Sequence, residues 1–205
     1  MISLYRYKTR FQALLRPVAG GLHRRGITAN QVTLTTCVVS VGLGIAAAAQ
    51  PASRYLFVLI ALWCLMRMAA NALDGMLARE YGQATPLGAQ LNEAGDIVAD
   101  IALSPPFAAV AASQPWPVVL LVALAVCGEL IAWLGTRTRA QRANHGPMGK
   151  SDRALVFGVT ALLIGCGVSY ETWINTLWWC VIALLCLTIV QRVRYLAALP
   201  VPAAR

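Results

Sequence analysis

The sequence predicts an all-α polytopic membrane protein: six transmembrane helices in a single domain over residues 1–205, with an amphipathic interfacial helix within residues 1–25. Three observations predict this class. Hydrophobic residues make up 59% of the chain and charged residues only 12%, which leaves too little polar surface to cover a soluble globule. Long windows carry no charge, and basic residues gather between them. No linker, composition break or internal repeat divides the chain.

The transmembrane helices are placed by length and apolar character, since about 20 apolar residues cross the hydrocarbon core of a bilayer. Ser104 and the two prolines after it predict a kink in the third helix rather than its end. The fifth helix is the shortest. The expected spans are residues 31–50, residue 55 into the segment 71–80, and residues 88–113, 116–135, 154–168 and 173–190.

The basic residues predict the orientation. They concentrate in residues 1–25, in the loop of residues 137–153 and in the C-terminal tail, all on one side of a six-span layout. The positive-inside rule therefore predicts that both termini are cytoplasmic. The compact chain without an extra domain is expected in an inner (plasma) membrane of bacterial type. The net charge of +9 is spread over these three segments without a recognition module, so membrane lipid headgroups rather than nucleic acid are the expected partner.

Residues 1–25 show apolar residues at helical spacing opposite several arginines, which is typical of a helix lying on an anionic membrane surface. The segment lacks the uninterrupted apolar run and cleavage site of a secretory signal peptide.

Polar residues recur on one face of each of two neighbouring predicted helices. Asn71 and Asp74 are three residues apart, and Asn92, Asp96 and Asp100 follow at intervals of four. Ionisable side chains at membrane depth are costly and usually mark function. Carboxylate and amide oxygens on two converging helices could hold a hard divalent cation that also binds substrate phosphates.

A purely structural interpretation is also open. Asp74 and Arg79 could be an ion pair at a helix end, and Asp96 with Asp100 could pair with Arg67 or Arg79 within the bundle. This alternative does not explain the small residues beside the acids, which would allow a bulky ligand to approach the backbone. These residues are Gly75, Ala78 and Gly88.

The spacing of these residues resembles the CDP-alcohol phosphotransferase (CDP-alcohol phosphatidyltransferase) family, whose pattern is DxxDGxxAR, eight residues, then GxxxDxxxD. The matching positions here are Asn71, Asp74, Gly75, Ala78, Arg79, Gly88, Asn92 and Asp96. Residues 25–30 also resemble the family's entry into its first helix.

The resemblance implies a six-helix membrane enzyme of phospholipid biosynthesis, usually a homodimer. It would transfer a phosphatidyl group from CDP-diacylglycerol to an alcohol acceptor and release CMP, with Mg²⁺ or Mn²⁺ as cofactor. Asn71, Asp74, Asn92 and Asp96 would hold metal, and Asp96 would also be the catalytic base. The residues implied in binding the CDP portion are Gly75, Ala78, Arg79 and Gly88.

Two positions depart from the family pattern, because Asn71 and Asn92 stand where the family has aspartate. The amide oxygen can still bind a hard cation, but the loss of two negative charges should weaken metal binding. Glu93 and Asp100 are candidate accessory residues. Two interpretations follow: an altered but working enzyme, or a catalytically degenerate relative that binds lipid or nucleotide without turnover.

Further charged residues lie outside the motif. Lys150 and Arg153 follow a Gly-Pro turn and are candidates for binding an anionic acceptor or the lipid phosphate, with plain positive-inside topology as the alternative. Glu129, in the fourth span, is expected to pair with Arg67. A small transporter component is disfavoured because the opposite side is almost bare of charge. The pattern does not identify the acceptor alcohol.

Overall fold

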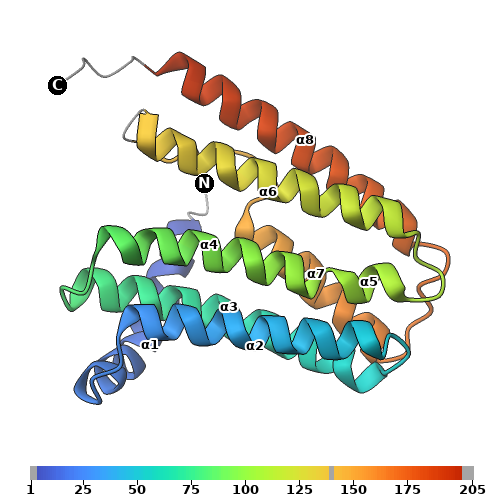
Figure 1. The fold of residues 1–205 in the computed structure, drawn as a ribbon, viewed down its shortest axis with the longest axis horizontal. Helices are drawn as coiled ribbons and strands as arrows, with labels where there is room; N and C mark the ends of the chain where they lie inside the picture. Colours follow the sequence, from blue (N-terminus) through green and yellow to red (C-terminus); the bar gives the residue numbers. More distant parts are fainter. Residues whose placement is uncertain (1–3, 139–140, 200–205) are drawn as a thin grey trace.

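The computed structural model describes residues 4–138 and 141–199, and these residues form helices without strands. Seven long helices and one short helix follow each other along the chain in that part (Figure 1). Their bounds are α1 Leu4–Arg24, α2 Ala29–Ala49, α3 Arg54–Glu80, α4 Pro86–Leu103, α5 Pro105–Ala109, α6 Pro115–Thr138, α7 Lys150–Gly165 and α8 Ile174–Ala198. The all-α class is therefore confirmed.

Local sequence signals explain where several helices begin and end. Thr28 and Gln31 form a reciprocal capping box at the start of α2. Thr85 caps α4 through its hydroxyl, which accepts a hydrogen bond of 2.9 Å from the Gly88 amide, and Pro86 occupies the first turn. Gly82, in the turn between α3 and α4, has a φ of 68°, which favours glycine. These caps fix the short turn between the two helices that carry the motif.

The break between α4 and α5 falls where the sequence predicts a kink. α4 ends at Leu103, and α5 resumes at Pro105 after the single residue Ser104. Proline has no backbone N–H, so the regular hydrogen-bond ladder is interrupted here. α5 continues along the direction of α4 (Figure 1).

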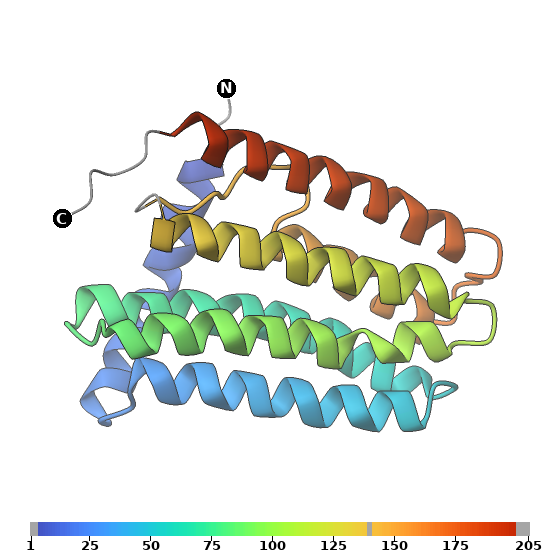
Figure 2. The same ribbon diagram turned by 45° about the horizontal axis from the view of Figure 1, so that its top comes forward.

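The helices from α2 to α8 run along a common axis, whereas α1 lies across one end of the bundle (Figure 2). The principal pairs are α3 with α7, α2 with α4, and α6 with α8. The first residues of α2 and α4 and the last residues of α3, α6 and α8 lie at the same end, on the left in Figure 1. We call this the site end, because it carries the residues of the predicted motif.

α1 is a helix, as the sequence predicts, and it is attached to the end of α3. Arg16 pairs with Glu80 at 3.1 Å, and the rings of His23 and Tyr81 lie 4.6 Å apart. Leu14 and Val18 remain exposed. Whether α1 lies at a membrane surface stays a prediction.

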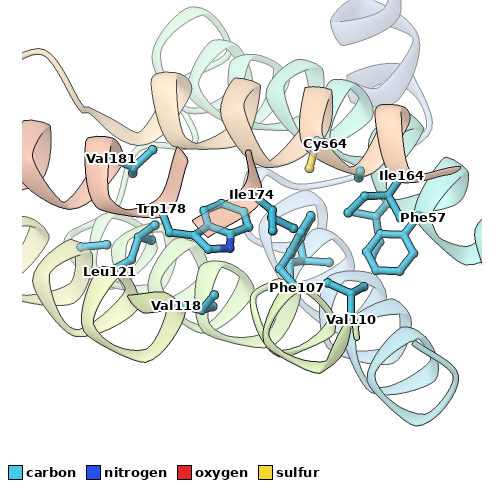
Figure 3. Packing of buried hydrophobic residues seen from close by; sticks show 14 of the residues in the cluster. Phe57, Cys64, Phe107, Val110, Val118, Leu121, Ile164, Ile174, Trp178 and Val181 are labelled. Atoms are coloured by element: carbon cyan, nitrogen blue, oxygen red, sulfur yellow. The ribbon is translucent and has the colours of Figure 1, made fainter. Parts of the chain in front are cut away.

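The core lies between α3, α5, α6, α7 and α8 (Figure 3). Phe107 is its centre: its ring lies 5.6 Å from that of Phe57 and 5.7 Å from that of Trp178, both edge-on. The buried Trp178 indole donates a hydrogen bond to Ser113 Oγ at 3.1 Å. Edge-to-face packing of this kind stabilises a core beyond the area it buries. It holds the bundle together away from the site end.

The count of six spans is not confirmed by helix length and apolar character. Within the described residues, four helices are long and apolar enough to cross a membrane: α2, α3, α6 and α8. α4 carries Glu93, Asp96 and Asp100 in 18 residues, and α7 has only 16 residues. Both helices nevertheless run beside the other four (Figure 1). Six spans stay a prediction.

We expect Gly44→Ala to lower the melting temperature of the protein, because α2 and α4 touch at this residue. A Cβ there would lie 1.9 Å from the carbonyl oxygen of Ala102, so the helices would have to separate. Such overpacking costs about 1–3 kcal/mol, occasionally more. Gly42→Ala on the same helix is the control, since a Cβ there meets nothing within 4 Å. Equal melting temperatures for the two variants would contradict the prediction.

Candidate active site

The four residues predicted to contact the CDP portion line one cleft at the site end. This cleft of about 290 Å³, which we call the glycine cleft, lies between the start of α2, the end of α3 and the start of α4. Its lining includes Gly75, Ala78, Arg79 and Gly88. The sequence pattern therefore selects residues that lie together in space.

The glycines of the cleft lie in close contact with neighbouring side chains. A Cβ on Gly88 would lie 2.6 Å from the side-chain oxygen of Asn30, and one on Gly75 would lie 2.8 Å from Nη2 of Arg79. The Arg79 guanidinium thus lies over Gly75, and no ion pair joins Arg79 to Asp74 among the described residues. The ion pair that the purely structural interpretation expected between Asp74 and Arg79 is therefore not formed in the described part of the chain.

Asp74 is held in the wall of the glycine cleft with one oxygen satisfied and one not. Its Oδ2 accepts a hydrogen bond of 2.8 Å from the Thr33 hydroxyl, whereas its buried Oδ1 has no hydrogen-bond partner among the described residues. A buried carboxylate oxygen without a partner is costly. Asn92 and Glu93 line the same cleft and add side-chain oxygens that can coordinate a metal ion. Such oxygen ligands suit a hard divalent cation.

Asp96, on α4, is contacted by side chains of α3 and α7. Asn71 Nδ2 donates to Asp96 Oδ1 at 2.7 Å, and Lys150 Nζ donates to Asp96 Oδ2 at 2.8 Å. Arg67 binds the Asp96 backbone carbonyl at 3.0 Å. Asn71, Arg67 and Lys150 line a second, open cavity of about 940 Å³ between α1, α3 and α7. We call it the open cavity.

The four predicted metal ligands are therefore divided. Asp74 and Asn92 line the glycine cleft, whereas Asn71 lines the open cavity and is hydrogen-bonded to Asp96. In the described part of the chain, no three histidine, cysteine, aspartate or glutamate side chains are grouped so as to hold a metal ion. With two of the four positions occupied by asparagine, the carboxylate contribution at the motif comes from Asp74 and Asp96.

The remaining predicted site residues take part in ion pairs. Lys150 pairs with Glu93 at 3.1 Å in addition to Asp96, and Arg153 pairs with Asp100 at 2.7 Å. Asp100 also pairs with Arg67 at 2.6 Å. The structural interpretation of Asp96 and Asp100 as partners of Arg67 is therefore correct for their contacts, whereas Arg79 has no part in them.

The expected pairing of Glu129 with Arg67 is wrong. Glu129 is 2% exposed and pairs instead with Arg142, Arg153 and Arg192, at 3.0, 3.2 and 3.4 Å. Arg67 turns to α4, while Glu129 on α6 faces α7, α8 and the loop before α7. The partners depend on which helices are neighbours, and the sequence does not show this.

Sequence reasoning also missed residues whose roles depend on tertiary contacts. In the sequence, Thr33 is an ordinary polar residue of a predicted span, and Arg192 is one of several basic residues in the predicted tail. Yet Thr33 is buried against Asp74, and Arg192 is 3% exposed beside Glu129. The signal that could have found Arg192 is its position inside the long helix α8.

Comparison with known proteins decides the family. Residues 26–186 match the CDP-alcohol phosphatidyltransferase family. The chain belongs to the CDP-alcohol phosphatidyltransferase family. The family that the motif indicated is thereby confirmed, and this family consists of transferases of phospholipid biosynthesis.

Two relatives show how far the similarity extends. The inner membrane protein YnbA of Escherichia coli (strain K12) is 42% identical over 195 residues, covering 94% of this chain and 96% of YnbA. A phosphatidylinositol phosphate synthase of Corynebacterium glutamicum is 29% identical over 190 residues, covering 88% of this chain and 83% of that protein. The likeness to both spans nearly the whole fold.

Solved structures share the fold. The Mycobacterium tuberculosis phosphatidylinositol phosphate synthase in complex with manganese and citrate matches with a TM-score of 0.72 and 22% identity, covering 92% of this chain and 91% of that one. The same enzyme with CDP-DAG bound matches with a TM-score of 0.69 and 22% identity, covering 92% and 96%. At this identity the likeness concerns the fold.

Proposed function

We propose that the protein is a metal-dependent phosphatidyltransferase that uses CDP-diacylglycerol and an alcohol acceptor and releases CMP. The observation that carries the proposal is the glycine cleft, in which the four motif residues expected at the CDP portion adjoin the unsatisfied oxygen of Asp74. Family membership and the CDP-DAG complex of the mycobacterial fold relative support the choice of donor.

In the proposed reaction, the oxygen of the acceptor hydroxyl forms a bond to the phosphorus that carries the diacylglycerol. The bond from that phosphorus to the CMP oxygen breaks, and CMP leaves. Asp96 takes the hydroxyl proton. The hydrogen bond from Asn71 and the ion pair with Lys150 fix the orientation of the Asp96 carboxylate, as a general base requires. Gly75 and Gly88 let the diphosphate approach the backbone, and Arg79 and Ala78 complete its surroundings.

Mg²⁺ or Mn²⁺ is the proposed cofactor, and a manganese complex of the mycobacterial relative supports this choice. Asp74 and Asn92 would hold it from the glycine cleft, and Asn71 and Asp96 from the other side of the wall, with Glu93 and Asp100 as accessory residues. The ion would neutralise diphosphate charge as CMP departs.

We place the protein in the bacterial inner membrane as a homodimer with both termini cytoplasmic. YnbA, named as an inner membrane protein, supports the location. The charged side chains of the site end, including Lys150 and Arg192, support the cytoplasmic side as the side of the reaction.

The decisive experiment is CMP release by the full-length protein, purified in detergent, from CDP-diacylglycerol with Mg²⁺ or Mn²⁺ and a panel of alcohols. We expect release that needs both an acceptor and a divalent ion, and that stops when EDTA is added. The absence of release with every acceptor and both metals would refute the transferase proposal.

A catalytically degenerate relative that binds lipid or nucleotide is the second candidate. It is favoured by the contacts of Asp96, both of whose carboxylate oxygens are engaged by Asn71 and Lys150. Retained binding of CDP-diacylglycerol without any CMP release would select this candidate over the enzyme.

Thr33→Val should weaken the binding of the metal without preventing folding. The variant keeps the shape of the side chain but removes the hydrogen bond to Asp74 Oδ2. Loss of a partner that orients a metal ligand typically costs 10–100-fold in metal affinity or activity. CMP release titrated with Mn²⁺ should show a half-saturating concentration raised by about 10-fold.

Thr36→Val is the control for this variant, because the Thr36 hydroxyl donates only to the carbonyl oxygen of Val32 in its own helix. If both variants show the same Mn²⁺ dependence as the wild type, Thr33 does not orient a metal ligand.

A further inference from the structure

Among the described residues, eight ion pairs join four carboxylates and four cations into one closed ring inside the bundle. Seven of the pairs have N–O distances between 2.6 and 3.4 Å, and the eighth joins Arg142 to Glu93. We call it the ion-pair ring. In order, its members are Asp96, Arg67, Asp100, Arg153, Glu129, Arg142, Glu93 and Lys150, which pairs again with Asp96.

The ring alternates in sign, so every cation in it contacts two carboxylates. Its formal charge is zero. Arg192 is a fifth cation beside it, and Arg192 is held by Glu129 at 3.4 Å and by the backbone carbonyls of Gly128 and His145 at 2.6 and 3.3 Å. These basic residues, which the sequence offers as an anion site, thus already have anionic or carbonyl partners.

Burial makes the pair of Arg67 with Asp96 hard to exchange, since the two side chains are 7% and 9% exposed, whereas Lys150 is 26% exposed. The side chains of Glu129 and Arg153 are 2% and 3% exposed. Binding a phosphate to a ring cation would displace a carboxylate, and removing one partner of a buried pair is strongly unfavourable. The displaced carboxylate would also lie close to the phosphate and repel it. The ring therefore opposes an acceptor that carries its own anionic group.

The ring borders the place that an acceptor must reach. If Asp96 takes the proton of the acceptor hydroxyl, as the proposed function requires, the acceptor lies next to the two ring cations on either side of Asp96. These are Arg67 and Lys150, which both line the open cavity. The remainder of the acceptor is then in contact with the ring.

We infer that the acceptor is an uncharged polyol, without a phosphate or carboxylate group; this rests on the proposed function. Hydroxyl groups both donate and accept hydrogen bonds, so they can add to the ring without displacing a carboxylate. An amino alcohol fits less well, because ring and Arg192 together carry one excess positive charge. The chain would differ in this from relatives named for phosphatidylinositol phosphate.

The test compares acceptors that differ only by a phosphate: glycerol with glycerol 3-phosphate, and inositol with inositol phosphate. CMP release from CDP-diacylglycerol with Mn²⁺ gives kcat/KM for each. We expect the wild-type protein to favour the unphosphorylated member of each pair by at least about 10-fold, a lower bound because loss of one partner of a fully buried pair corresponds to about 100-fold or more. A wild-type preference for the phosphorylated member would overturn the inference.

Glu93→Gln makes the test specific to the ring. Glu93 is a partner of both Arg142 and Lys150 and is partly exposed, so its replacement leaves each of these cations with one carboxylate partner instead of two and disturbs the core little. We expect the preference to move towards the phosphorylated acceptor by about 10-fold. Glu80→Gln, which removes an exposed pair with Arg16 outside the ring, should leave the preference unchanged. Equal preferences in wild type and Glu93→Gln would refute the role of the ring.

A binding measurement separates failure of this inference from failure of the proposed function. The melting temperatures of the wild type and Glu93→Gln are compared in inorganic phosphate and in chloride of equal ionic strength. We expect phosphate to stabilise only the variant. Phosphate stabilisation of the wild type would overturn the inference even without CMP release, whereas the absence of release from every acceptor would refute only the transferase. If the variant does not fold, the wild-type response decides.

Discussion

Replacing Asp96 with asparagine is expected to abolish acceptor-dependent CMP release while CDP-diacylglycerol still binds. Asparagine has nearly the same shape and can still form hydrogen bonds, but its amide cannot take the proton of the acceptor hydroxyl. Loss of a general base lowers the rate by about 10²–10⁴-fold. The measurements are CMP release under saturating CDP-diacylglycerol and, in parallel, binding of CDP-diacylglycerol to the purified variant.

Asp152→Asn is the matched control for this variant. Asp152 lies in the first turn of α7, and its carboxylate accepts a hydrogen bond of 2.9 Å from the Gly149 amide, a contact that asparagine can retain. We expect it to keep most of the wild-type rate. If Asp96→Asn retained a comparable rate, another group would have to accept the proton, and the role given to Asp96 would be wrong.

Glu129→Gln should produce the largest loss of stability of any single charge change at the site end. The side chain is 2% exposed and is shared by three arginines, of which Arg153 and Arg192 are themselves almost fully buried. Glutamine keeps the volume but leaves the cations with less compensation. Breaking a buried ion pair by removing one partner costs about 3–5 kcal/mol. Thermal unfolding in detergent should therefore show a markedly lower melting temperature.

Two further variants distinguish lost charge compensation from a general packing defect. Glu171→Gln changes an exposed glutamate and should leave the melting temperature unchanged. Glu129→Gln combined with Arg192→Met removes a carboxylate together with a cation whose acidic partner is Glu129. The double variant should be destabilised by less than the sum of the two single changes, since the two residues interact directly. Simple additivity would show that Glu129 and Arg192 are not energetically coupled.

The residues of the glycine cleft could be predicted from the sequence, whereas the partners in the ion-pair ring could not. This difference has a physical cause. Gly75, Gly88 and Asp74 sit at fixed intervals on two helices joined by a short capped turn, so their sequence spacing nearly determines their positions in space. Their convergence on one cleft follows from local structure. The ring members Glu129 and Arg142 come from α6 and the loop after it, and no interval in the sequence relates them to Glu93.

The helical class, the approximate positions of the long helices, the break at Ser104 and the motif that indicates the family could all be predicted from the sequence. Hydropathy, proline and capping act over a few residues, so they can be read from the chain alone. Three features depend on how the helices pack: Thr33 contacts Asp74, Glu129 pairs with three arginines rather than with Arg67, and the cations predicted to bind an anion are already paired. Those contacts depend on which helices are neighbours and at what register they pack, and these follow from the burial of side chains across the whole bundle.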